Sequence, residues 1–171
     1  MNWSALRDAL YDWTVIGGDT AIWLNQSAPQ PTEDYYGLQI VSVIRVGDDY
    51  VASTANGDGE IEVLGNRDFT LNIHYYGVDA FLKIDDKVNS LQLPTVQNYL
   101  NENNIIYVNN GNTTDAPNLY DSSYKEHALN TITFRAANIQ IDNTGYYDNV
   151  IIDGSIKEGT NTITRTIDVQ I

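Results

Sequence analysis

The stretch that decides the fold lies at residues 66–77 and reads Asn66-Arg67-Asp68-Phe69-Thr70-Leu71-Asn72-Ile73-His74-Tyr75-Tyr76-Gly77. Apolar residues occupy the odd positions from Phe69 to Tyr75, and mostly polar residues stand between them. Because successive residues of a strand face opposite sides of a sheet, this alternation predicts a strand with one buried face. After Gly77 an apolar stripe recurs at helical spacing: Phe81, Ile84, Val88 and Leu91. We expect the fold to form around this strand and the helix, 78–91, that follows it.

Two other segments have helical patterns. Residues 3–13 follow Asn2, a candidate N-cap, and precede a stop at Gly17-Gly18. Their apolar stripe is Trp3, Leu6, Leu10 and Trp13. Pro94 ends the 78–91 helix and suits the first turn of a short third helix. The sequence therefore predicts two or three helices.

The remaining patterns predict strands at 20–25, 35–46, 105–108, 131–141, 149–152 and 163–171. A change of apolar phase within 131–141 predicts a β-bulge near Ala136-Ala137, and 109–124 reads as a polar, irregular excursion. Residues 48–63 predict a protruding hairpin, because Asn-Gly and Asp-Gly form tight turns. The expected fold class is α+β: one domain, 1–171, with a mixed, mainly antiparallel sheet packed by helices and a projecting hairpin at about residues 48–65.

The composition of the chain limits the kinds of molecule that it can bind. The chain has 23 acidic residues against nine Lys plus Arg, and a formal charge of −14. Affinity for nucleic acid comes mostly from cations that neutralise phosphates, so these few, scattered cations argue against tight binding of DNA or RNA. The absence of cysteine excludes disulfides, thiol nucleophiles and cysteine zinc sites. We see no secretory signal and no apolar run that could cross a bilayer, so neither export nor membrane insertion is expected.

The sequence contains no recognisable catalytic motif. His74 and His127 are the only histidines, they have no metal-ligand spacing, and both are interpreted as surface residues. Asn56-Gly57-Asp58-Gly59-Glu60 departs from the calcium-loop pattern and reads better as a hairpin tip. No catalytic residue, cofactor site or metal site is therefore predicted. An enzymatic function is the least favoured of the interpretations.

Tyrosine doublets stand at 35–36, 75–76 and 146–147. On a strand, each doublet should place one ring inward and one outward. An outward tyrosine contributes contact area while its hydroxyl still finds a partner, which suits a protein interface. It equally suits stacking on a sugar, so the doublets favour binding or assembly without deciding between them.

The order of these elements resembles the neck and tail terminator proteins of tailed bacteriophages. The resemblance rests on the N-terminal helix, on the strand at 66–77 with its following helix, and on three short motifs: Ala28-Pro29-Gln30-Pro31, Tyr36-Gly37-Leu38-Gln39-Ile40 and Phe134-Arg135-Ala136. It implies a small α+β structural subunit of the virion that forms a ring, commonly a hexamer. It further implies that the ring caps the tail tube and joins it to the head connector, with DNA passing through the lumen. Such subunits are assembled in the host cytoplasm and contact the tube protein, neck and connector proteins, and in some tails the sheath.

The residues agree with this reading. An acidic wall would let DNA slide past without sticking, although acidity also serves simply to keep a protein soluble, which is the more common reason for it. We expect the hairpin and the proline-bearing loop before the second strand to make ring or neck contacts, through Pro29, Pro31, Tyr35, Asn56, Asp58, Glu60 and Tyr76. A β-rich module that binds carbohydrate or protein, as in fibres and adhesins, stays open as the alternative. The helices at 3–13 and 78–91 are awkward for a pure β-sandwich and so weigh against it.

Overall fold

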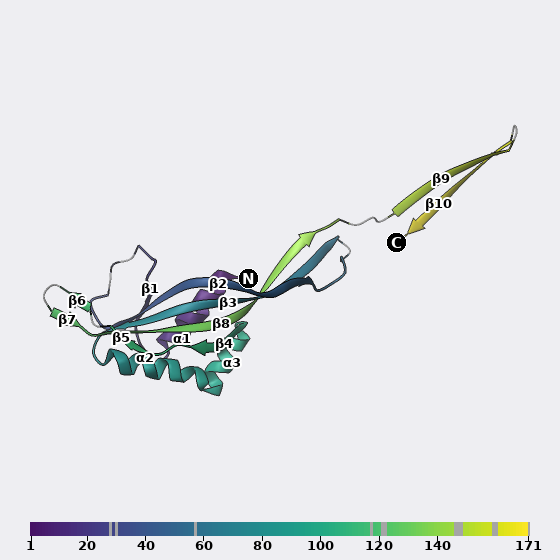
Figure 1. The fold of residues 1–171 in the computed structure, drawn as a ribbon. Coiled ribbons are helices and arrows are strands. Elements are labelled where there is room, and N and C mark those ends of the chain that lie inside the picture. Colours follow the sequence, from purple (N-terminus) through teal and green to yellow (C-terminus); the bar gives the residue numbers. More distant parts are fainter. Residues whose placement is uncertain are drawn as a thin grey trace. The chain divides into compact units, whose positions relative to one another are not determined.

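The computed structural model describes residues 1–27, 29, 31–56, 58–116, 118–120, 123–145, 149–158 and 161–170 (Figure 1). The helices are α1 (Trp3–Val15), α2 (Ala80–Asn89), the 3-10 turn η1 (Ser90–Gln92) and α3 (Pro94–Glu102). The strands are β1 (Ala21–Trp23), β2 (Tyr35–Val51), β3 (Glu60–Tyr76), β4 (Ile105–Asn110), β5 (Thr114–Asp115), β6 (Asn118–Tyr120), β7 (Ser123–Lys125), β8 (His127–Asn143), β9 (Asn149–Glu158) and β10 (Asn161–Gln170). These elements form two compact units: Met1–Tyr50 with Leu64–Ile139, and Val51–Val63 with Gln140–Ile171.

The main sheet has the strand order β1-β2-β3-β8-β4, and β5 also pairs with β8. The short strand β1 is parallel to β2, whereas β4 and β5 are antiparallel to β8. Two further sheets, β6–β7 and β9–β10, have two antiparallel strands each. The predicted α+β class, with a mixed, mainly antiparallel sheet and helices, is confirmed.

The core of the first unit forms on one face of the sheet. All four odd-numbered residues of β3 from Phe69 to Tyr75 are buried, as the alternation predicted. The Phe69 ring stacks on Phe134 of β8, with 5.6 Å between centroids, and Trp3 of α1 meets it edge-on at 6.2 Å. Buried residues of all three α-helices belong to the same cluster. Because one sheet face and the apolar stripes of the helices exclude water together, the helices are fixed on that side.

Several predicted boundaries are wrong, and the strands are longer than expected. β2 continues past Val46 to Val51, and β3 already begins at Glu60, so the predicted hairpin is the continuation of two sheet strands. The segment 109–124, predicted as irregular, contains the end of β4 and the short strands β5, β6 and β7. Backbone pairing stabilises strands even where the side chains alternate poorly, which explains why periodicity ended them too early.

The register of β8 against β4 ends at Ala136, so the predicted bulge near Ala136-Ala137 stays a prediction, and burial offers a second reason for the change of apolar phase. Even-numbered residues of β8 are buried as far as Ala136, whereas Ile139 is 54% exposed, because the strand has left the core by then. The register shift in the β4–β8 pairing lies on β4, between Tyr107 and Asn109.

The N-terminus of helix α2 is held by carboxylates from other parts of the chain. Its N-cap, Asp79, has a left-handed backbone (φ 57°) and makes no side-chain cap. Asp34 accepts a hydrogen bond from the Val78 amide (3.1 Å), and Glu126 accepts one from the Ala80 amide (3.4 Å). Negative charge at a helix N-terminus is favourable. The carboxylates just before β2 and β8 therefore fix where α2 starts.

The C-terminus of α1 is closed by Lys87 of α2. The Lys87 ammonium donates to the carbonyls of Thr14 (2.8 Å) and Ile16 (3.2 Å) and pairs with Asp19 at 3.4 Å. Burial lowers the pKa of Lys87, and Asp19 opposes this shift. Since the last carbonyls of a helix have no partner within it, a cation at this point satisfies them and favours the dipole.

Replacing this cation should destabilise the first unit. Lys87→Met leaves the α1 carbonyls without their donor, and we expect the free energy of unfolding to fall by about 1–3 kcal/mol. The matched control is Lys83→Met on the same helix, since Lys83 is exposed and should cost much less. Urea unfolding followed by circular dichroism measures both. Equal losses in the two variants would contradict the role given to Lys87.

Candidate assembly surfaces

The proline-bearing loop and the tyrosines after it have different environments. Pro29 is exposed and Pro31 is partly exposed. Tyr35, by contrast, is only 2% exposed, and Tyr36 beside it is 1% exposed. The expectation of one outward ring in each doublet is therefore wrong for this pair, because other side chains cover both faces of β2 here.

Tyr35 starts a stack of three rings. It lies on Tyr76 at the end of β3 (centroids 4.9 Å apart), and Tyr76 lies on His127 at the start of β8 (4.4 Å). His74 lies beside His127, edge to edge and nearly parallel to it, with 5.2 Å between the centroids. The three strands thus bring together two predicted interface tyrosines and both histidines. The interpretation of the histidines as separate surface residues is wrong: His127 is 5% exposed, and the two rings are hydrogen-bonded.

The hydrogen bonds define the protonation of the pair. His127 Nδ1 lies 2.8 Å from the Ala116 carbonyl, which can only accept, so this nitrogen carries a proton. In the neutral ring, His127 Nε2 then accepts from His74 Nδ1 at 3.0 Å. His74 Nε2 remains buried without a hydrogen-bond partner. Burial lowers the pKa of His74 to about 4, and the neighbouring His127 adds to the shift. Within the described residues no group of three or more ligating side chains could hold a metal ion.

This pair should make stability depend on pH. The pKa of His74 is about 4 in the fold against an ordinary 6.5, so the unfolded chain binds its proton first as the pH falls. The contribution is complete above pH 6.5 and is lost between pH 6.5 and 4, amounting to at most about 3 kcal/mol. We expect His74→Gln to flatten the pH profile of the unfolding free energy over this window. An unchanged slope would exclude His74 as its source.

The tip between β2 and β3 is organised by Asn56 in the second unit. Its side-chain oxygen accepts from the amides of Asp58 and Glu60, both at 2.9 Å, and its amide group donates to the Glu60 carboxylate at 3.2 Å. The Gly59 carbonyl accepts from the amide of Thr144 at 3.0 Å. Asn56 and Asp58 are exposed and Glu60 is partly exposed. The three predicted hairpin residues are therefore brought together in one ordered, acidic tip.

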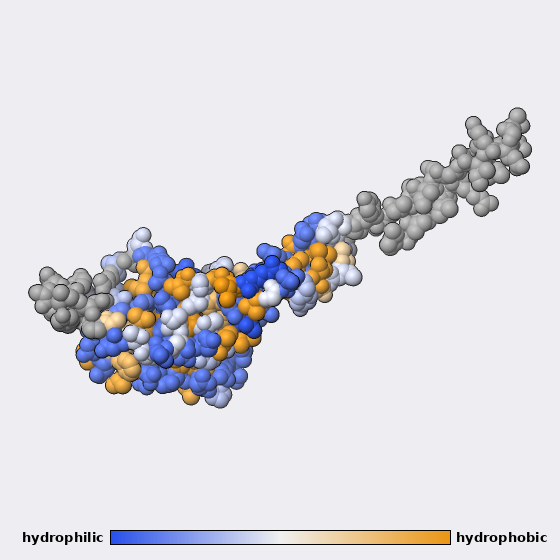
Figure 2. All heavy atoms as spheres, viewed as in Figure 1, coloured by the Kyte–Doolittle hydropathy of each residue, from blue (hydrophilic) through white to orange (hydrophobic). Residues whose placement is uncertain are grey.

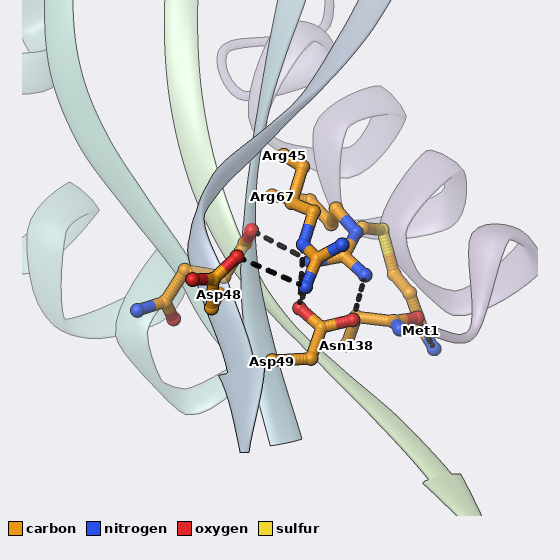
Figure 3. A network of polar contacts seen from close by, with 7 residues as sticks. Met1, Arg45, Asp48, Asp49, Arg67 and Asn138 are labelled. Carbon is orange, nitrogen blue, oxygen red and sulfur yellow. Dashed lines mark hydrogen bonds and ion pairs between the residues drawn. The ribbon is translucent and has the colours of Figure 1, made fainter. Parts of the chain in front are cut away.

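A network of charged groups lies on β2 and β3 of the first unit (Figure 3). Arg67 donates twice to Asp49, at 2.7 and 2.6 Å, and Arg45 approaches the same carboxylate at 3.4 Å. The hydrogen bonds from Arg67 hold the pKa of Asp49 below its usual value. A Cβ on Gly65 would lie 1.8 Å from an Asp49 oxygen, so only glycine leaves room for this pair. The N-terminal ammonium of Met1 donates to Asn138 at 2.9 Å in the same view.

Other cations of the first unit also have acidic partners. Arg135 of β8 pairs with Asp68 of β3 through two hydrogen bonds, at 2.6 and 2.9 Å, which lower the pKa of Asp68. Lys87 is held by Asp19 as described above. Four of the nine cations, Arg45, Arg67, Lys87 and Arg135, are thus engaged with carboxylates of the same chain. The sequence could not reveal the partners of Arg67, Lys87 and Arg135, because these carboxylates lie far away in the sequence.

Apolar side chains are exposed where the long strands continue beyond the core. On β2, buried residues stop at Leu38, and Val41 (46% exposed), Val43 (42%) and Ile44 (60%) follow. Hydrophobic residues are visible at the surface among hydrophilic ones in Figure 2. Contiguous exposed apolar surface marks protein contact sites, whereas single exposed apolar residues are common.

A separate hollow of about 520 Å³ lies among α1, α2 and α3. Its apolar lining includes Trp13, Leu93 and Val96, and Lys87 with Asp19 stands at its polar side. None of the described helices is long and apolar enough to cross a membrane.

The fold is α+β, its ion pairs join neighbouring elements, and apolar side chains are exposed on β2. Comparison with known protein families gives a match over residues 4–170 to the family described as phage neck terminator protein. The chain belongs to this family, which confirms the resemblance drawn from the sequence and makes the protein a structural component of the bacteriophage neck. No curated protein matches the chain.

Proposed function

We propose that the chain is the ring-forming subunit of the phage neck. In this proposal six copies close into a ring that caps the tail tube and joins it to the head connector, and DNA passes through the lumen. Neighbouring tube, connector and, in contractile tails, sheath proteins pack against the ring.

The observation that carries the proposal is the uncovered apolar surface of the long strands. β2 runs 17 residues, but its buried residues end at Leu38, its fourth. Val41, Val43 and Ile44 then remain exposed in a single chain. A neighbouring copy would cover them, and head-to-tail contacts that close produce a ring of defined number. The ordered tip at Asn56 and the loop with Pro29 and Pro31 remain the proposed contacts with the next copy or with neck partners.

Removing the tip should prevent assembly without unfolding the chain. The segment Ala52–Glu60 lies outside the first unit, whose core does not use it. We expect the deletion variant to keep its circular dichroism and thermal transition but to have the mass of a single shortened chain in light scattering, slightly below the 19.1 kDa of the full chain. The wild-type chain should have about six times that mass. A deletion variant with the wild-type mass would exclude the tip as a ring contact.

The electrostatic part of the proposal concerns the passage of DNA. Phosphate affinity depends on free Lys and Arg, and here carboxylates of the same chain hold Arg67 and Arg135. The remaining acidic excess repels the phosphate backbone. A lumen formed from such a surface would not retain DNA.

Freeing the arginines should therefore create DNA affinity. Asp49→Asn with Asp68→Asn removes the carboxylates that hold Arg67 and Arg135, and we expect salt-sensitive binding of duplex DNA in a fluorescence anisotropy titration. Asp85→Asn with Asp86→Asn is the matched control, since it changes net charge equally but is not part of the ion pairs described above. The wild type and the control should bind much more weakly. Equal binding by both double variants would show that net charge alone matters.

A further inference from the structure

The ribbon β9–β10 is a sheet of two strands. Ten residues of β9 pair with ten of β10 in an unbroken antiparallel register, from Asn161 opposite Glu158 to Gln170 opposite Asn149. Among the described residues, each strand has only the other as its partner in the sheet order. A two-stranded ribbon is marginally stable in water, and a third strand or a packed face is needed to stabilise it. The ribbon therefore requires a contact beyond itself.

Its register separates apolar from polar residues. Ile156 is opposite Ile163, Ile152 is opposite Ile167, and Val150 is opposite Val169. Directly opposed residues of an antiparallel pair share a face, and alternate pairs share the same one. The same face also holds Gly154 opposite Arg165 and Glu158 opposite Asn161, so three of its five pairs are apolar. The pairs of the other face are mostly polar: Lys157 with Thr162, Ser155 with Thr164, Asp153 with Thr166, Ile151 with Asp168 and Asn149 with Gln170. The apolar residues of the ribbon are thus concentrated in sequence on one face.

The first unit has a sheet edge on β2 that also exposes apolar side chains. β1 pairs with β2 only at Tyr36–Leu38, and it is the last strand on that side of the sheet. From Gln39 to Val46, this edge of β2 has no strand partner among the described residues. Val41 and Val43 are exposed along it. An open edge with apolar side chains is a template for an added strand.

Charge favours a second copy of this chain as the source of the added strand. Two chains of formal charge −14 repel each other, so a contact between them needs a segment of low charge. The segment 149–170 contains three acids (Asp153, Glu158, Asp168) and two bases (Lys157, Arg165), which leaves a net charge of −1. It has most of its apolar residues on one face and is nearly neutral.

We propose that the β9–β10 ribbon of one copy adds to the open edge of β2 of the next, at Gln39–Val46. The inference rests on the proposed ring and specifies a contact within it. The added strand would give the ribbon its missing third strand and would cover Val41 and Val43. Each copy would then give one ribbon and receive one, which is the arrangement that a closed ring requires.

Single cysteines test the contact directly, because the chain has none of its own. Val43→Cys is made in one sample and Ile167→Cys in a second with a mass tag; the two are mixed, allowed to assemble and treated with a short bismaleimide. We expect a cross-linked pair with one chain of each kind. Leu82→Cys, at a 60% exposed site on α2, replaces Val43→Cys in the control and should give no such pair. Equal cross-linking in the two mixtures would overturn the proposal. So would a cross-link confined to single chains that carry both Val43→Cys and Ile167→Cys.

A pair of matched double variants tests whether the apolar face is required. Ile152→Asp with Ile167→Asp places two charges on that face, and Ser155→Asp with Thr164→Asp places two on the other. We expect the first variant to fall to the mass of one chain in light scattering and the second to keep the mass of the wild type. If the wild type itself is a single chain, the ring proposal fails. If the wild type and both variants are rings, the ring survives and the ribbon contact is wrong.

Discussion

The packing of Phe69 between Phe134 and Trp3 is the interaction on which the first unit depends. It joins the central strand β3 to its neighbour β8 and to the N-terminal helix. Because the odd-numbered residues of β3 are buried together, the helices must cover that face and no other. Because the helices cover one face of the sheet, polar pairs such as Arg135 with Asp68 lie on the opposite face. The position of the helices therefore determines which side chains remain accessible to other molecules.

The core is shorter than the strands that pass through it. β2, β3 and β8 each have 17 residues, and the buried part of β2 ends at Leu38. Backbone hydrogen bonds continue the strands where apolar packing has ended, but they do not cover side chains such as Val43. In the proposed ring, this exposed surface would become buried where copies meet.

The effect of the charged residues also depends on the tertiary structure. The acidic excess of the sequence is visible from its composition, but its effect depends on where the nine cations are. Arg67 lies on Asp49 only because Gly65 leaves space for the carboxylate. Cations held in this manner stabilise the fold and have few donors left for phosphate. The family role in the phage neck and the electrostatics of the chain are therefore compatible.

The sequence by itself determined the α+β class, the buried face of β3, the helices near 3–13 and 78–91 and the family resemblance, because hydrophobic periodicity is a local property of the chain. It also placed Asn56, Asp58 and Glu60 in one turn. Only the tertiary structure decided that Tyr35 is covered, that His74 and His127 form a pair, and that Arg67 belongs to Asp49. These contacts join residues up to 53 positions apart on different strands, and strand register, which local patterns do not encode, sets them.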